Sequence, residues 1–195
     1  MRDLGPVGDR SILLTFDDGP NPETTPLVLQ RLSAHGAKAV FFMIGERIDA
    51  SPATAKEVTA AGHRLGNHTY SHRAPDPWFG AYVGDVRRCQ QACARHTGVT
   101  PTLFRPPKGH LSPTSLIVPK AFGLTTVNWS LNVRDWDCRD EDEAFAAADR
   151  LVQHATPGDI VLLHDDRQLV LPLLDVVLPQ LRAEGFDLSS AVDRL

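Results

Sequence analysis

The stretch LLTFDDGPNP, Leu13–Pro22, joins a buried strand to two adjacent carboxylates. Its first four residues, Leu13–Phe16, are apolar or β-branched and predict a buried β-strand. Asp17 and Asp18 follow this strand directly, and a Gly-Pro turn signal comes after them. Two neighbouring negative charges repel each other, so the rest of the sequence has to explain what the second carboxylate is for.

Comparable strands recur along the chain and alternate with longer segments of helical periodicity. The predicted strands are Ser11–Phe16, Ala39–Met43, Arg64–Asn67, Leu103–Arg105, Thr125–Trp129, Ile160–His164 and Phe186–Leu188. The predicted helices are Glu23–His35, Ala53–Ala61, Tyr82–Thr97, Ser112–Phe122, Asp142–Ala155 and Val170–Glu184. This alternation predicts an α/β fold with a parallel sheet, either open and doubly wound or closed into a barrel. In both, the chemistry lies at the carboxyl ends of the strands.

Length and composition are those of one globular domain. The chain has 195 residues, of which 42% are apolar and 23% charged, and we expect residues 1–195 to form a single domain. The net charge of −4 and the lack of a Lys/Arg run argue against nucleic-acid binding. No apolar run approaches the roughly 20 residues of a membrane span. The N-terminal MRDLGPVGDR lacks the apolar segment of a secretory signal.

Polar residues suited to catalysis or metal binding follow most of the predicted strands. They are Asp17 and Asp18 after the first strand, His68 and His72 after the third (NHTYSH), Arg105 at the end of the fourth (FRPPKG), Asn132, Asp135 and Trp136 after the fifth (WSLNVRDW), and His164 at the end of the sixth (VLLHDD). Because the carboxyl ends of parallel strands meet at one rim, we expect these side chains to build one site.

The pair His68-x-x-x-His72 is the strongest local indication of a metal site. Two imidazoles four residues apart can face one ion when the segment makes a helical turn. A carboxylate from the first strand end completes a three-ligand set with an open position, which is typical of catalytic zinc. One aspartate can then be the ligand and the other the base, and a divalent cation cancels the repulsion between them. The alternative is a turn in which one aspartate caps a helix at Asn21–Glu23 and the other is solvated.

Five motifs occur in a specific order: TFDDGP, HTYSH, RPP, an NxxDW segment and LLH. In this order they resemble the polysaccharide deacetylases (carbohydrate esterase family 4, the NodB-homology domain). The resemblance runs from about Ile12 to the C-terminal segment and implies a distorted (β/α)7 TIM-like barrel. It also implies metal-dependent removal of N-acetyl, sometimes O-acetyl, groups from a polysaccharide or oligosaccharide of the chitin or peptidoglycan type.

The resemblance also implies a role for individual residues. It implies one divalent ion, usually Zn²⁺ and sometimes Co²⁺ or Ni²⁺, held by the metal ligands Asp18, His68 and His72. It implies a catalytic group made of the base Asp17, the arginine that positions it, Arg105, the acid His164 and the aspartate that tunes it, Asp135. It further implies substrate contacts from Trp136 and Leu162 to the acetyl methyl group, and from a backbone N–H near Pro107 and Lys108 to the oxyanion. Plain core packing of Trp136 and Leu162, and a structural ion pair between Arg105 and Asp135, are the alternatives.

Two positions depart from the commoner family pattern. Lys108 stands where many members carry an aromatic residue after RPP, and it places a cation at the cleft. We hypothesise that Lys108 favours a substrate with an anionic group, such as a lactyl- or uronate-bearing sugar; the alternative is an exposed lysine whose stem covers Trp136. Asn132 stands where the family often has an aspartate, but Asp135 is retained, so we expect activity to persist.

Two other functions compete with deacetylation of a glycan. One is hydrolysis of a small cyclic amide, as in allantoinase-like relatives, and the other is carbohydrate binding by an inactive homologue. The intact set of metal ligands, base and acid favours deacetylation of a glycan over both alternatives. Location stays open: the missing signal and three unpaired cysteines favour the cytoplasm, whereas a polymeric substrate favours the cell envelope or exterior of a chain trimmed of its leader. The sequence does not indicate an oligomeric state.

Overall fold

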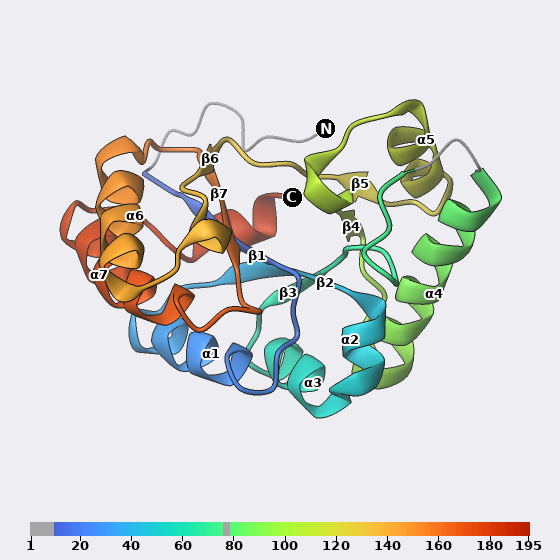
Figure 1. Cartoon of the computed structure of the whole chain (residues 1–195), viewed down its shortest axis with the longest axis horizontal. Helices are drawn as coiled ribbons and strands as arrows, with labels where there is room; N and C mark the ends of the chain where they lie inside the picture. Colours follow the sequence, from blue (N-terminus) through green and yellow to red (C-terminus); the bar gives the residue numbers. More distant parts are fainter. Residues whose placement is uncertain (1–9, 76–78) are drawn as a thin grey trace.

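Among residues 10–75 and 79–195, which the computed structural model describes, seven parallel strands form one curled sheet (Figure 1). The strands are β1 (Leu13–Asp17), β2 (Ala39–Met43), β3 (Arg64–Asn67), β4 (Leu103–Phe104), β5 (Thr125–Thr126), β6 (Leu131–Asn132) and β7 (Ile160–His164). Their order is β5-β4-β3-β2-β1-β7-β6, so β5 and β6 are edges and the barrel stays open between them. The distorted (β/α)7 barrel expected from the sequence is confirmed. The N-terminal segment, for which no secretory signal is predicted, lies outside the described residues.

Helices cover the outer face of this sheet (Figure 1). They are α1 (Thr25–Ala34), α2 (Gly45–Ala50), α3 (Pro52–Ala60), α4 (Phe79–Thr97), α5 (Pro113–Ala121), α6 (Glu141–His154) and α7 (Val170–Ala183), with short 3₁₀ turns η1 (Pro107–Gly109), η2 (Asp135–Asp137) and η3 (Ser190–Arg194). Local capping explains several starts; for example, the Asp140 side chain accepts the Glu143 N–H at the start of α6. No helix in the described part of the chain is long and apolar enough to cross a membrane.

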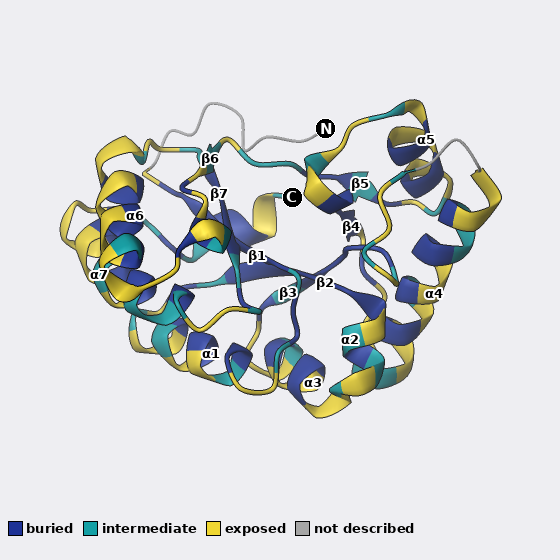
Figure 2. Ribbon diagram, viewed as in Figure 1, coloured by how far each residue is buried: buried dark blue, intermediate teal, exposed yellow. Residues whose placement is uncertain are grey.

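Alternation along β1 separates the two faces of the sheet. Leu14 and Phe16 pack into the large cluster that the sheet forms with its helices. Leu13 belongs to a smaller cluster on the inner face, which η3 covers with Ala191 and Val192. Figure 2 shows the central strands β1 and β2 buried, while the outer sides of the helices are exposed. The same alternation turns Thr15 and Asp17 toward the interior of the barrel.

Some predicted elements differ from the structure. Phe186–Leu188 is not a strand: a single bridge joins Asp187 to Ser11, and the Asp187 carboxylate accepts the N–H groups of Ser189 and Ser190, which turns the chain into η3. The predicted strand Thr125–Trp129 shortens to β5. The helix α2 and the strand β6 were not predicted, because neither has enough residues to establish a period.

Candidate active site

The carboxyl ends of the strands bring the predicted site residues to one rim. Asp17 ends β1 and lies opposite His164, which ends β7, in the parallel register of the two strands. His68 directly follows β3, Arg105 directly follows β4, and Asp135 begins η2 shortly after β6. Residues from five strands therefore meet in one place, as the sequence predicts.

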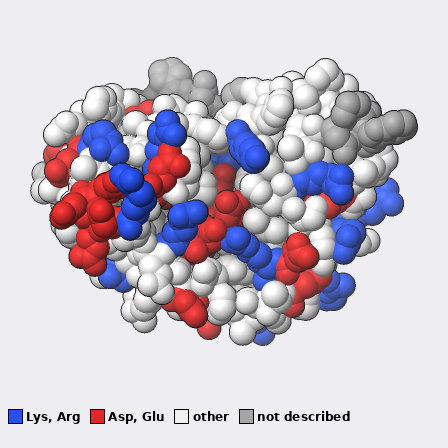
Figure 3. Space-filling view, viewed as in Figure 1, with Lys and Arg blue, Asp and Glu red and all other residues white. Residues whose placement is uncertain are grey.

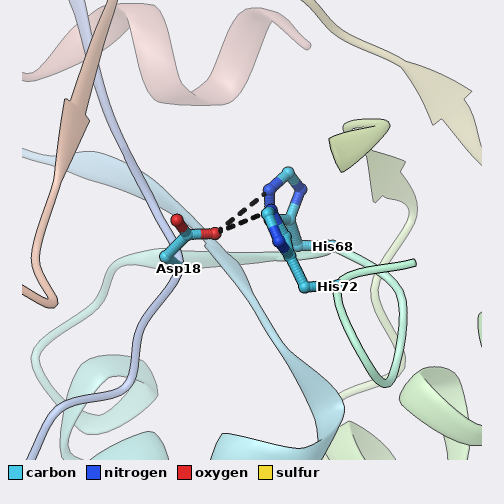
Figure 4. A group of neighbouring side chains, drawn as sticks. All are labelled: Asp18, His68 and His72. Atoms are coloured by element: carbon cyan, nitrogen blue, oxygen red, sulfur yellow. Dashed lines mark ion pairs between the residues drawn. The ribbon is translucent and has the colours of Figure 1, made fainter. Parts of the chain in front are cut away.

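Asp17 and Asp18 point in different directions. Asp17 is buried, and its Oδ1 accepts a hydrogen bond from Arg105 Nη1 at 2.7 Å. Asp18 has a left-handed backbone with φ of 70°, which turns its carboxylate toward the two histidines (Figure 4). The strand end thus presents one carboxylate to a guanidinium and the other to a pair of imidazoles.

Asp18, His68 and His72 form a compact group of potential metal ligands. One ligand atom from each residue lies within 4.8 Å of the others. Asp18 Oδ1 lies 3.4 Å from His68 Nε2 and 3.2 Å from His72 Nε2 (Figure 4). The segment between the histidines is not the helical turn that would bring such a pair together: it is a loop in which both Thr69 and His72 adopt a positive φ. The two rings converge because the loop turns back on itself.

The chemistry of these three atoms fits a divalent cation. His68 Nδ1 lies 2.8 Å from the carbonyl oxygen of Arg105, and only a protonated Nδ1 can donate to that oxygen. His68 Nε2 therefore presents a lone pair to Asp18, in the arrangement usual for metal-binding histidine. Asp18 Oδ1 is itself buried and has no hydrogen-bond partner among residues 10–75 and 79–195. Electron-pair donors directed at one point are costly to bury unless a cation lies between them.

The protonation states of Asp18 and His72 suit metal binding as well. Burial alone would raise the pKa of Asp18, but contact with His68 and the charges that His68, His72 and His164 carry when protonated hold that pKa well below its usual range. Burial lowers the pKa of His72, although the Asp18 charge opposes the change. At neutral pH, Asp18 is therefore a carboxylate and His72 a neutral imidazole, which are the forms that bind a metal.

Arg105 is fully buried and is held by hydrogen bonds on every nitrogen. It donates from Nε to the Val127 carbonyl oxygen at 3.2 Å and from Nη2 to that of Asn128 at 3.1 Å. Its Nη1 donates to both Thr15 Oγ1 and Asp17 Oδ1 at 2.7 Å. Burial lowers the pKa of Arg105, and the Asp17 charge opposes this. The proposed alternative, an ion pair with Asp135, does not occur, because Asp135 binds His164 instead.

His164 and Asp135 form the second charged pair of the rim. His164 Nδ1 lies 3.1 Å from Asp135 Oδ1, and the His164 backbone N–H donates to Asp135 Oδ2 at 2.7 Å. Burial lowers the pKa of His164, but the hydrogen bond and charge of Asp135, with the charges of Asp17 and Asp18, raise it to about 9. Trp136 packs edge-on against the ring, with 5.2 Å between ring centroids. Since its pKa is about 9, His164 carries a proton at neutral pH.

These groups open into one pocket of about 410 Å³. It is lined by Asp17, Asp18, His68, His72, Lys108, Trp129, Trp136, Leu162, His164, Asp166 and Arg167. Of the predicted site residues, Arg105, Asp135 and Pro107 do not line the pocket. Arg105 contacts Asp17, and Asp135 contacts His164, and both of these partners do line it. In Figure 3, acidic side chains occupy the middle of the face shown, with basic side chains on both sides.

Trp129, Asp166 and Arg167 line the pocket but are not among the site residues predicted from the sequence. Trp129 lies just beyond the short β5, and Arg167 follows the VLLHDD motif, so chain position was the available indication for both. A second cavity of about 490 Å³ lies beside η2 and α6 and is lined by Val133, Cys138 and Arg150 among others. It contains none of the three potential metal ligands.

The loop after Arg105 brings Lys108 to the pocket. Lys108 and Gly109 both have positive φ, 59° and 63°. A Cβ at Gly109 would lie 2.4 Å from the Trp129 ring, so this position requires glycine. This tight turn brings Lys108 to the pocket that Trp129 also lines. The backbone N–H that binds the oxyanion was expected near this residue.

Comparison with known proteins agrees with this geometry. The family model for polysaccharide deacetylase matches residues 5–127. The chain belongs to the polysaccharide deacetylase family. It is 35% identical to a peptidoglycan-N-acetylglucosamine deacetylase of Bacillus cereus, covering 93% of this chain and 86% of the relative. It is 34% identical to a chitooligosaccharide deacetylase of Azorhizobium caulinodans, covering 91% of each.

A solved structure supports the same assignment. The peptidoglycan deacetylase PdaC of Bacillus subtilis superimposes with a TM-score of 0.84 at 28% identity, over 93% of this chain and 88% of that one. The chain spans only 37% of the longer PgdA relatives from Listeria monocytogenes. Membership of this family supports the predicted deacetylase activity, and the cyclic-amide alternative is not favoured.

Proposed function

We propose that this polysaccharide deacetylase removes acetyl groups, chiefly N-acetyl groups, from amino sugars of a glycan. The observation that carries the proposal is one pocket that combines three features. A set of potential metal ligands, Asp18, His68 and His72, lies between two charged pairs of opposite character. In one pair Arg105 holds the carboxylate of Asp17, and in the other Asp135 holds the imidazole of His164.

Asp18, His68 and His72 are proposed to hold one divalent ion. Two imidazoles and one carboxylate are a donor set that suits Zn²⁺, and Co²⁺ or Ni²⁺ can take the same donors. When bound, such an ion polarises the amide carbonyl and acidifies water. The hydrogen bond from His68 to the Arg105 carbonyl fixes the ring that the ion would meet.

Asp17 is proposed to take the proton of the attacking water. The base must be ionised and aimed at the pocket, and Arg105 meets both needs by holding Oδ1 while Oδ2 stays free for the water. Asp17 Oδ2 lies 3.7 Å from His68 Nε2, so the base borders the ligand group directly. Thr15, on the same face of β1, shares Arg105 Nη1 and fixes the guanidinium.

His164 is proposed to donate a proton to the departing nitrogen. An amine leaves an amide only when it is protonated, so the acid must hold its proton at working pH. Asp135 keeps the imidazole charged and fixes its orientation through Nδ1, which leaves Nε2 to face the pocket. Base and acid therefore reach the substrate from two neighbouring strands, β1 and β7.

The remaining pocket residues are proposed to select the substrate. Trp136 and Leu162 offer an apolar wall for the acetyl methyl group, and the backbone N–H of Lys108 can bind the developing oxyanion, because Pro107 has none. Lys108 and Arg167 add two cations to the lining. They favour the expectation that the preferred sugar carries an anionic group.

The test is release of acetate from acetylated sugars in the presence of zinc. N-acetylglucosamine oligomers, N-acetylmuramic acid-containing peptidoglycan and allantoin would be compared, with acetate and ring opening measured separately. Acetate from glycans that stops on chelation supports the proposal. Ring opening of allantoin without acetate release would support the cyclic-amide reading instead. Tight zinc binding without either reaction would point to a binding role.

A further inference from the structure

The loop between β3 and α4 carries both histidine ligands, yet it has an irregular backbone. Thr69 has a φ of 64° and His72 a φ of 54°. Residues with a side chain seldom adopt this left-handed region, and a chain that holds two of them needs strong outside contacts. Such contacts come from α2 and α4.

The helix α2 binds the carbonyl groups of the loop. The Gly45 N–H donates to the Thr69 carbonyl oxygen at 3.0 Å, and the Glu46 N–H donates to that of Tyr70 at 2.9 Å. A Cβ at Gly45 would lie 2.6 Å from the Tyr70 ring, so α2 and the loop are closely packed there. These contacts leave the N–H groups of the same loop segment to be satisfied from elsewhere.

Asp85, on α4, satisfies them. Its Oδ2 accepts the Tyr70 N–H at 3.0 Å and the Ser71 N–H at 3.1 Å, and its Oδ1 accepts the Ser71 hydroxyl at 3.0 Å. Asp85 is buried, with 6% of its surface exposed. A buried carboxylate is costly unless several donors compensate it, and here the loop supplies all three of those donors. The residue after this segment is His72.

The two histidines differ in how they are oriented. The His68 ring is fixed directly, through Nδ1, by the Arg105 carbonyl oxygen. For the His72 ring, the contacts found within the described residues are the one to Asp18 at 3.2 Å and a tilted contact with the His68 ring, with 5.1 Å between ring centroids. His72 is also the more exposed of the two, with 31% of its side chain accessible against 2% for His68. Its position is therefore set by the backbone that precedes it.

We propose that Asp85 is a positioning residue for the metal site, which holds His72 in place through the backbone of Tyr70 and Ser71. The inference rests on the proposed function, because it assumes that Asp18, His68 and His72 bind a divalent ion. Asp85 does not touch the site itself. Its carboxylate acts as the outer support of a ligand whose ring has no hydrogen bond to fix it within the described part of the chain.

The test compares zinc affinity in the wild type and in Asp85→Asn, by competition with a chromophoric chelator and without substrate. Asparagine keeps one acceptor oxygen for the two backbone N–H groups but has no negative charge, and its amide N–H₂ faces the Ser71 hydroxyl, so the charge-assisted hydrogen bonds to the loop are lost. Loss of an outer support typically weakens metal binding by about 10–100-fold, and we expect a loss of at least about tenfold. The visible spectrum of the Co²⁺ form should change as well, since it reports ligand geometry.

Asp187→Asn is the matched control. Asp187 Oδ1 accepts the Ser189 N–H at 2.8 Å, the Ser189 hydroxyl at 2.7 Å and the Ser190 N–H at 3.3 Å, so it repeats the same three kinds of hydrogen bond. It lies at the amino end of β1, far from the rim that carries the site. We expect Asp187→Asn to lower the melting temperature of the metal-free protein without weakening zinc binding.

The outcomes separate the two proposals. If the wild type does not bind zinc, the metal site and the proposed function fail together. If the wild type binds zinc and Asp85→Asn binds it equally well, the positioning role of Asp85 is wrong while the metal site stands. Should Asp85→Asn not fold, Ser71→Ala removes one of the three hydrogen bonds, and zinc binding weaker by about two- to fivefold is expected. Unchanged zinc affinity in Ser71→Ala would overturn the proposal.

Discussion

Replacing Asp135 with asparagine should lower the pKa of His164 and move the alkaline limit of activity. In the wild type, burial is outweighed by Asp135 together with the charges of Asp17 and Asp18, and the pKa of His164 is raised from 6.5 to about 9. The Asp135 oxygens accept both the backbone N–H and the ring Nδ1–H of His164. Asparagine has one acceptor oxygen, so its amide N–H₂ must face one of these donors. A charged imidazole then loses its counter-charge and its acceptor together.

The size of the effect follows from that pKa. The rise from 6.5 to about 9 corresponds to roughly 3 kcal/mol of stabilisation of the imidazolium, at about 1.4 kcal/mol per pH unit. Without Asp135, the pKa of His164 falls back toward 6.5, because burial is then opposed only by the charges of Asp17 and Asp18. An acid must be protonated to act, so activity is lost as pH rises through its pKa. At pH 8 we expect a loss of about 30-fold in kcat/KM, and little loss near pH 6.

The assay is acetate release from N-acetylglucosamine oligomers, followed as kcat/KM from pH 5.5 to pH 10 with saturating zinc. Asp137→Asn is the matched control, because Asp137 lies two residues away and pairs with the exposed Arg134 instead of His164. Its profile should follow the wild type. If Asp135→Asn keeps the wild-type alkaline limit, Asp135 does not tune the acid, and the role given to the His164–Asp135 pair is refuted.

Three further predictions concern the metal, the fold and the substrate. Zinc at about 100 times its dissociation constant should stabilise the folded protein by about 2.7 kcal/mol in a thermal-shift assay, and the shift should vanish with chelator and in His72→Ala; a shift that survives in His72→Ala contradicts the ligand set. Arg105→Gln should lower the free energy of unfolding, measured in urea, by about 3–5 kcal/mol, because it leaves Asp17 buried and unpaired. The surface variant Arg31→Gln should lower it by less than about 1 kcal/mol. Equal losses in the two variants would contradict the role given to the Arg105–Asp17 pair. Lys108→Ala should reduce the preference for anionic over neutral acetylated sugars in competition assays, and an equal preference before and after the change would sink the hypothesis.

The strand ends of this site could be predicted because short-range patterns define them. Alternation along LLTFD sets which residues face the barrel interior, and parallel strands bring their carboxyl ends to one rim. Asp17, His68 and His164 could therefore be expected to meet before any coordinates were known. The five ordered motifs also indicated the type of reaction, deacetylation of a glycan, which hydrophobic periodicity alone could not do.

The loops could not be predicted in the same way, because contacts from distant helices shape them. The spacing of His68 and His72 suggested a helical turn, but α2 and α4 hold the segment as a left-handed loop instead. Asp85 carries no local motif, and its role depends on the packing of α4 against the loop. The strand β6 has two residues and no apolar run, so it becomes visible only through its pairing with β7.

The most direct test of the whole account is acetate release by Asp17→Asn compared with the wild type, with zinc bound to both. The account assigns Asp17 to proton transfer and Asp18 to metal binding, so Asp17→Asn should keep zinc affinity while acetate release falls by about 100-fold or more. A variant that binds zinc normally and still releases acetate at the wild-type rate would contradict the division of labour between the two carboxylates, and with it the mechanism proposed for this site.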